Sequence, residues 1–171
     1  MKKNFIALLI PAALGLACGS VGAAGAATTP AIVRHKIPGS DFPIAQAVSI
    51  APGTTIHFIS GQVPPLADKD APADSLAAYG DTKTQTMGVL KKIQEVLQSM
   101  KLDMPDVVKM QVFLVGDPAN GGRADIKGFM AAYTQFFGGS QPNLPARAVM
   151  QVAALNNPGW LVEIEVVAAK K

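Results

Sequence analysis

The sequence has few of the residues that carry thiol, metal or redox chemistry. Its 171 residues include one cysteine, two histidines and one tryptophan. Cys18 lies within a predicted N-terminal targeting segment, and removal of that segment leaves no residue for a disulfide or a reactive thiol. His35 and His57 lack the spacing of a metal site or of a Ser/His/Asp arrangement. The sequence therefore predicts no metal site.

Net charge is also low once the targeting segment is set aside. The chain has 15 basic and 12 acidic residues, and Lys2 and Lys3 belong to that segment. The remaining 13 basic residues leave a net charge of +1 and form no cluster. Because nucleic-acid binding depends on neutralising several phosphates, we expect no nucleic-acid partner.

The first 26 residues have the three parts of a secretory signal peptide. Lys2 and Lys3 form the positive region, residues 5–16 the apolar region, and Ala24-Gly-Ala26 the cleavage pattern. Pro11 interrupts the apolar region, which is too short for a permanent membrane span. We expect a mature protein that is periplasmic or secreted and has no stable membrane association.

A lipid anchor on Cys18 is the alternative to cleavage near Ala26. Ala17 precedes Cys18 as such a signal requires, but Gly15 and Leu16 do not fit the usual positions. Cleavage near Ala26 is the reading that we favour.

The remainder reads as one domain, 44–171, preceded by an extended lead-in, 27–43. Residues 45–50 and 55–60 are β-prone and flank the turn sequence Ala51-Pro-Gly-Thr54, which predicts a β-hairpin. A proline-rich loop, 64–80, follows.

Two amphipathic helices and three strands are predicted after that loop. The first helix begins at Thr82, with Gln85 at the spacing of a capping box, and its apolar stripe ends at Met100. The second helix runs from 125 to 137 and buries Ile126 among others. The strands are 107–115, 147–154 and 161–168.

The resulting order, β-β-α-β-α-β-β, predicts an α+β two-layer sandwich with two helices on one face of a mixed sheet. Several strands have apolar residues on both faces. We therefore expect the helix-free face to pack against other copies in a closed homo-oligomer.

Arg147 is the only charged residue between Lys127 and Glu163. It lies in an apolar run, and a guanidinium keeps its charge at any physiological pH. Burying it unpaired is costly, so Arg147 reaches water, pairs with an acid such as Glu163 or Glu165, or binds an anionic ligand.

Short motifs throughout the chain resemble the Rid family, also called the YjgF or UK114 family. They occur in the family's order on the predicted elements and cover about residues 43–169. The matching segments are Ser60-Gly-Gln-Val-Pro64, the helix from Gln85 to Met100, Asp106-Val-Val-Lys-Met-Gln-Val-Phe113, Tyr133-Thr-Gln-Phe-Phe137, Pro145-Ala-Arg147 and Val162-Glu-Ile-Glu165.

This resemblance implies a chorismate-mutase-like fold assembled as a homotrimer with ligand clefts between subunits. It also implies cofactor-free and metal-free hydrolysis of enamines and imines, such as 2-aminoacrylate, to 2-keto acids and ammonia. Arg147 would then clamp the substrate carboxylate, and Glu163, expected on an adjoining strand, would orient water or transfer protons. Ser60, Gly61 and backbone groups near Val149 would line the pocket.

Three positions depart from the family pattern. Ile44, Met130 and Val149 stand where typical deaminases of the family have tyrosine, asparagine and often cysteine. The predicted clamp is kept while its surroundings become apolar. A non-catalytic module that binds a small carboxylate or a protein in the same cleft is therefore the alternative. Ribonuclease activity, assigned to some relatives, has the least support because the mature chain is nearly neutral.

Overall fold

The computed structural model describes residues 30–139 and 141–171. The predicted signal peptide, 1–26, and Cys18 lie outside these residues. Within the described ranges, no helix combines the length and the apolar character that a membrane crossing needs.

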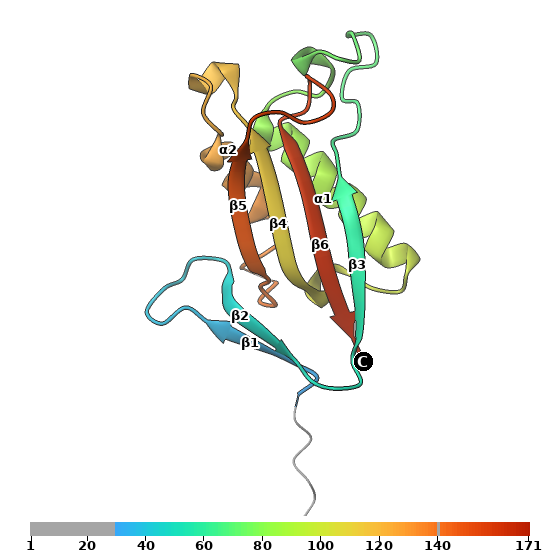
Figure 1. The fold of residues 1–171 in the computed structure, drawn as a ribbon, viewed down its shortest axis with the longest axis vertical. Coiled ribbons are helices and arrows are strands. Elements are labelled where there is room, and N and C mark those ends of the chain that lie inside the picture. The colour runs from blue at the N-terminus through green and yellow to red at the C-terminus, as the bar shows by residue number, and fades with distance from the viewer. Residues whose placement is uncertain (1–29, 140) are drawn as a thin grey trace, which may run out of the picture.

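Six strands form one mixed sheet in the spatial order β1-β2-β5-β4-β6-β3 (Figure 1). The pairs β2–β5 and β4–β5 are parallel, and the other three pairs are antiparallel. The strands are β1 (Ile32–Lys36), β2 (Ala45–Ile50), β3 (Thr55–Gln62), β4 (Val107–Val115), β5 (Ala146–Val152) and β6 (Val162–Lys170).

Two helices, α1 (Thr82–Ser99) and α2 (Ile126–Tyr133), cover one face of the strands β5, β4, β6 and β3 (Figure 1). The described chain also has three short 3-10 turns, η1 (Leu76–Ala78), η2 (Met104–Asp106) and η3 (Pro118–Asn120). The predicted α+β sandwich is confirmed, with one further strand, β1, formed by part of the lead-in.

The core lies between the helices and the sheet because the apolar faces of both layers pack together there. Alternate residues of β4 are buried, as the pattern over 107–115 predicts. Leu90, Ile93 and Leu97 of α1 are fully buried against them. Met100 and Ile126, also predicted to be buried, are exposed because each lies at the end of its helix, beyond the sheet contact.

The predicted hairpin between 45–50 and 55–60 is wrong. The turn exists, with Gly53 at a φ of +79° and a hydrogen bond from the Thr54 amide to the Ala51 carbonyl. However, β2 pairs with β1 and β5, whereas β3 pairs with β6 at the opposite edge of the sheet. The turn therefore connects two strands that diverge.

The predicted capping box at Thr82 and Gln85 is also wrong. Asp81 is the N-cap, and its side chain accepts a hydrogen bond from the Thr84 amide at 2.8 Å. The buried Gln85 side chain instead donates to the Gly80 and Gly159 carbonyls and accepts from the Leu161 amide. Gln85 thereby joins α1 to the start of β6.

Arg34 fastens β1 to two other strands. Its Nη2 donates to the carbonyls of Pro105, at 2.8 Å, and Val107, at 3.1 Å, where β4 begins. Its Nε donates to the Leu144 carbonyl, at 3.1 Å, just before β5. Burial lowers the pKa of this guanidinium, and nearby Asp106 partly offsets that effect. Because β2 pairs with β5 at one position only, these bonds are a main attachment of the β1–β2 hairpin.

We predict that Arg34→Met lowers the free energy of unfolding by about 1–3 kcal/mol, because the charged hydrogen bonds are lost and three carbonyls need other partners. Arg123→Met is the matched control, since Arg123 is exposed and no side-chain hydrogen bond or ion pair of it is found in the described chain. Chemical denaturation of both variants provides the measurement. Equal stability of the two variants would contradict the role given to Arg34.

Candidate functional site

Arg147 is the second residue of β5 and lies on the helix-covered side of the sheet. Its register partner on β4 is Met110, which is fully buried in the core between sheet and helices. Val149, two residues further along β5, is opposite Val112 and faces the same way. The strand pattern therefore directs the Arg147 side chain toward α2.

Three aromatic rings surround the Arg147 guanidinium. Its central carbon lies 4.1 Å from the ring centre of Tyr133, 5.1 Å from that of Phe129 and 5.5 Å from that of Phe42. Phe129 and Tyr133 belong to α2, whereas Phe42 comes from the segment between β1 and β2. Contacts of this kind each stabilise a cation by about 0.5–2 kcal/mol, so the rings partly replace lost hydration.

The hydrogen bonding of Arg147 is incomplete. Nη2 contacts the Met130 sulfur at 3.4 Å, which is a weak acceptor, and Nη1 is buried without a hydrogen-bond partner among the described residues. Lys170–Asp106 is the only ion pair in the described ranges, so neither Glu163 nor Glu165 pairs with Arg147 within one chain. Burial lowers the pKa of Arg147, with Tyr133 as a smaller opposing influence.

Tyr133 connects this guanidinium to the N-terminal segment. Its hydroxyl donates to the Pro43 carbonyl at 2.8 Å, which holds residues 42–44 over the end of α2. Burial raises the pKa of Tyr133 to about 12, although the positive charge of Arg147 acts in the opposite direction. The hydroxyl therefore stays protonated and continues to donate at physiological pH.

Arg147 lines a pocket of about 280 Å³ between β2 and β5, where these strands separate. The other lining residues are mostly apolar: Ile37, Ile44, Ala45, Ala146 and Ala148, together with Gln46 and Lys109. No acidic residue is among them. Ala146, Ala148 and Lys109 face the side of the sheet opposite to the Arg147 side chain, whereas the guanidinium Nη1 is buried on the helix-covered side.

The sequence prediction identified Arg147, Ile44 and Met130 but missed most of their neighbours. Met130 contacts the guanidinium, and Ile44 lines the 280 Å³ pocket together with Arg147. Phe42 and Ile37 were missed because they belong to the lead-in, which shows no clear periodicity. The apolar stripe of α2 gave a usable signal for Phe129 and Tyr133, but it predicted core packing rather than contact with a cation.

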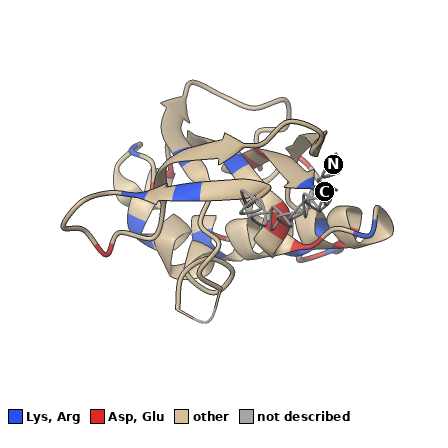
Figure 2. Ribbon diagram, turned by 90° about the horizontal axis from the view of Figure 1, so that it is seen from below, with Lys and Arg blue, Asp and Glu red and all other residues tan. Residues whose placement is uncertain are grey.

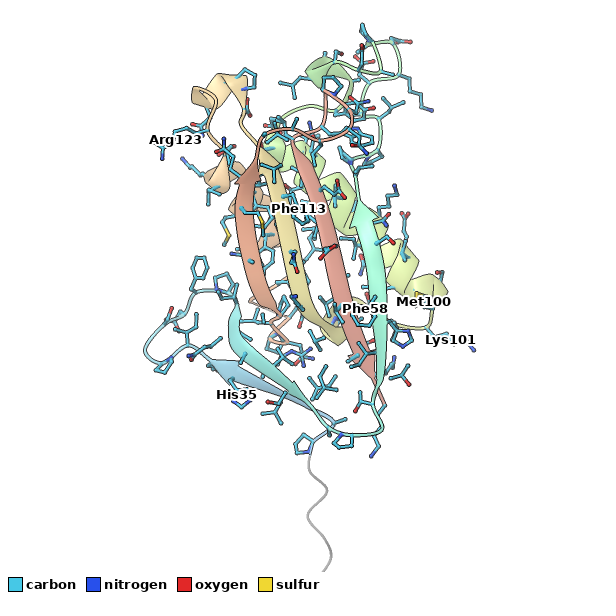
Figure 3. The ribbon with its side chains drawn as sticks, viewed as in Figure 1. His35, Phe58, Met100, Lys101, Phe113 and Arg123 are labelled. Carbon is cyan, nitrogen blue, oxygen red and sulfur yellow. The ribbon has the colours of Figure 1, made fainter. Side chains whose placement is uncertain are left out.

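Glu163 lies on the other side of the sheet. It is opposite Phe113 of β4, and both side chains face away from the helices, where Figure 3 shows Phe113 and Phe58. A Cβ added at Gly61 would overlap the Glu163 carboxylate, so glycine allows this side chain to lie close to the β3 backbone. Ser60 and Gly61 lie where the β3–β6 register shifts, and Ser60 is exposed.

The described residues contain no group of three or more His, Cys, Asp or Glu side chains placed to hold a metal ion. Basic residues are spread over several elements, as Figure 2 shows. The arrangement around Arg147 thus offers an isolated cation in apolar walls, which suits a small organic anion.

Residues 42–170 match the protein family described as Endoribonuclease L-PSP. The human 2-iminobutanoate/2-iminopropanoate deaminase is 36% identical over 140 residues, covering 80% of this chain and 87% of the human protein. A RutC family protein of Pyrococcus abyssi is 30% identical over 143 residues, covering 82% and 96% of the two chains. A crystal structure of a Rid-family protein of unknown function from Yersinia pestis aligns with a TM-score of 0.62 at 26% identity, covering 81% and 98%.

The chain belongs to the Rid family. Its α+β fold matches the structures of that family, as the sequence motifs predicted. The candidate residues of this Rid protein nevertheless form two separate groups within one chain. Arg147, Met130, Val149 and Ile44 surround the start of β5, whereas Glu163, Gly61 and Ser60 lie on β6 and β3.

The two groups lie on opposite faces of the sheet. Glu163 was expected on a strand adjoining that of Arg147, but β4 lies between β5 and β6. Arg147 faces the same way as Met110, and Glu163 the same way as Phe113, three residues further along β4. A site that uses both residues therefore has to take them from two copies of the Rid protein.

We predict that Tyr133 ionises with a midpoint near pH 12 in the native protein and near pH 10 when unfolded. Because the folded-state pKa is the higher one, its contribution to stability is present below about pH 10 and is lost as pH rises toward 12. Tyr79→Phe leaves Tyr133 as the only tyrosine, so tyrosinate absorbance reports it alone. Equal midpoints in buffer and in urea would refute the buried environment described here.

Proposed function

We propose that this protein hydrolyses 2-imino acids, the tautomers of enamines such as 2-aminoacrylate, to 2-keto acids and ammonia without a cofactor. The observation that carries the proposal is the buried Arg147 Nη1, which has no hydrogen-bond partner in the described chain and belongs to a guanidinium surrounded by aromatic rings without a paired carboxylate. A carboxylate accepts two parallel hydrogen bonds from such a guanidinium.

Similarity to named enzymes supports the same reaction class. The human relative and one from goat, each 36% identical, are both 2-iminobutanoate/2-iminopropanoate deaminases. Their names concern those proteins, and the proposal transfers the activity at the level of the family.

In the proposed reaction, water adds to the imine carbon and a carbon–oxygen bond forms. One water proton goes to the imine nitrogen, and the carbon–nitrogen bond breaks as the second proton moves from oxygen to nitrogen, releasing ammonia and leaving the keto group. Arg147 holds the carboxylate, which fixes the imine carbon relative to the water. A carboxylate beside that water accepts and returns protons, which is the role proposed for Glu163.

We further propose that Glu163 reaches this site from a second copy of the chain, in a homotrimer. The helix-free face of the sheet supports this assembly, because Phe58 is 82% exposed there and Met150 is exposed on the neighbouring part of the same face. Exposed apolar side chains on one sheet face are typical of a subunit interface.

Subunit mixing tests this arrangement. We predict that Arg147→Ala and Glu163→Gln each lower kcat/KM at least about 100-fold. In a hybrid trimer of the two variants one site in three is complete, because a complete site needs Arg147 from one copy and Glu163 from the next, so activity returns to roughly a third of the wild-type value. Activity is measured after co-expression with two different affinity tags, so that only hybrid oligomers are assayed.

The control for mixing is the double variant, Arg147→Ala with Glu163→Gln, co-expressed with either single variant. No complete site can form there, and activity should stay at the single-variant level. If hybrid oligomers of the two single variants form and remain inactive, shared sites are refuted. Light scattering on each variant verifies that the oligomer persists.

We predict that Gly61→Ala lowers kcat by about 10-fold or more while the free energy of unfolding changes little. The new Cβ overlaps the Glu163 carboxylate, and the flexible end of that side chain can move away at small cost in stability but loses its catalytic position. A stopped assay at saturating substrate and a denaturation curve measure the two effects. Unchanged kcat would argue against a role for Glu163 in catalysis.

The alternative is a carboxylate-binding module without catalysis. The separation of Arg147 from Glu163 within one chain favours it, since a monomer would keep the clamp but have no acid beside the bound anion. Calorimetry with a 2-keto acid, together with the absence of any acceleration of imine decay, would establish this alternative.

A further inference from the structure

The Arg147 Nη1 atom is closed off from solvent by its neighbours. It is buried and has no hydrogen-bond partner among the described residues. An oxygen that accepts a hydrogen bond from this nitrogen has to come within about 3 Å of it. No water-sized atom fits at that distance while the surrounding side chains keep their positions. Binding of a ligand at Nη1 therefore requires at least one covering side chain to move.

The side chains that contact the guanidinium are fastened to different extents. Phe129 and Tyr133 are fully buried, and Met130 lies beside them on α2, which packs against α1. Phe42 is 49% exposed and belongs to no helix or strand. Displacing a core ring exposes much more apolar surface than displacing a half-exposed one. Phe42 is therefore the cover that moves at the lowest cost.

The segment that carries Phe42, residues 37–44, has little attachment of its own between β1 and β2. Three of its hydrogen bonds lie within the segment: Ser40 amide to Ile37 carbonyl, Phe42 amide to Ser40 Oγ, and Ile44 amide to Phe42 carbonyl. Apart from strand pairing at its ends, one hydrogen bond joins it to the rest of the described chain, from the Tyr133 hydroxyl to the Pro43 carbonyl.

Packing beneath this segment is incomplete as well. A pocket of about 590 Å³ lies between residues of the segment and the residues that follow α2. Unfilled space of this size means that fewer contacts have to be broken when the segment moves. The single Tyr133–Pro43 hydrogen bond is then a main restraint on the position of Phe42.

We infer that Phe42 controls access to Arg147: residues 37–44 swing outward as the Tyr133–Pro43 hydrogen bond breaks, and this movement uncovers Nη1. The inference rests on the proposed function only in taking the entering group to be the substrate carboxylate. The movement itself depends on neither catalysis nor the identity of the ligand.

The exposure of Arg147 can be measured without a substrate. Phenylglyoxal is a neutral dicarbonyl that condenses with the terminal nitrogens of an arginine side chain, and peptide mass spectrometry gives its rate at each site. Labelling of a covered group follows the population of the open state. The other two arginines are references: Arg123 is exposed, and Arg34 is held by three hydrogen bonds that the movement does not break.

Two substitutions should open the site. Phe42→Ala removes the covering ring, and we expect Arg147 labelling to become about 10-fold or more faster. Tyr133→Phe keeps the ring over the guanidinium but deletes the hydroxyl, and we expect about a 2- to 10-fold increase. Leu66→Ala is the matched control, because Leu66 is 45% exposed and contacts neither Arg147 nor the segment's pocket. Unchanged labelling of Arg34 verifies that each variant is folded.

A disulfide should close the site. The Pro43 Cβ lies 3.3 Å from the position of a Cβ at Gly138, close to the separation of about 3.5–4.5 Å in disulfides. We expect oxidised Pro43→Cys with Gly138→Cys, in a chain that also carries Cys18→Ser, to label at Arg147 at least about 10-fold more slowly than its own reduced form. The reduced form accounts for any strain from the two substitutions.

The outcomes separate this inference from the proposed function. An Arg147 labelling rate equal to that of the wild type in Phe42→Ala or Tyr133→Phe, or equal rates for the oxidised and reduced double-cysteine protein, overturns the inference even if imines are hydrolysed. Changed labelling without hydrolysis of any imine and without calorimetric binding of pyruvate supports the inference while the proposed function fails. Where pyruvate binds, its association rate should rise in Phe42→Ala and fall in the oxidised double-cysteine protein, and equal association rates overturn control of entry by Phe42.

Discussion

The alternation of side chains along β4 determines where every candidate residue of this protein can act. Met110 and Phe113 differ by an odd number of positions, so the residues paired with them face opposite ways. Arg147 thereby faces the helices and Glu163 the open side of the sheet. No rotamer change brings two side chains together through a strand. Chemistry that needs both residues depends on assembly, whereas anion binding needs Arg147 alone.

The environment of Arg147 favours an incoming anion over water. Burial has already removed much of the hydration of the guanidinium, as its lowered pKa reflects. Three aromatic rings stabilise its faces, but the Nη1 edge remains without an acceptor in the described chain. Ion pairs are stronger in low-dielectric surroundings, so a carboxylate placed at that edge gains more than it would at an exposed arginine.

Local sequence patterns predicted the elements but not how they pair. The period-2 pattern of 107–115 and the apolar stripe through Leu90, Ile93 and Leu97 reproduce β4 and α1, because burial against a neighbouring layer sets both periods. The turn at Ala51-Pro-Gly-Thr54 was equally clear, yet its flanking strands pair elsewhere. Arg147 could be recognised because it is the only charge in a long apolar stretch. Its aromatic neighbours could not, because aromatic residues on a helix are used both for core packing and for contact with a cation.

The lead-in is the part of the chain that covers Arg147 beside β5. Without residues 37–44, Arg147 would lie at the open edge of β5. Arg34 and the Tyr133–Pro43 hydrogen bond hold this segment in place, and neither could be inferred from spacing because each joins residues about 70 or more positions apart. Ile37, Phe42 and Ile44 then supply apolar walls. The same segment thus covers one side of the guanidinium, with the ring centre of Phe42 at 5.5 Å from its central carbon.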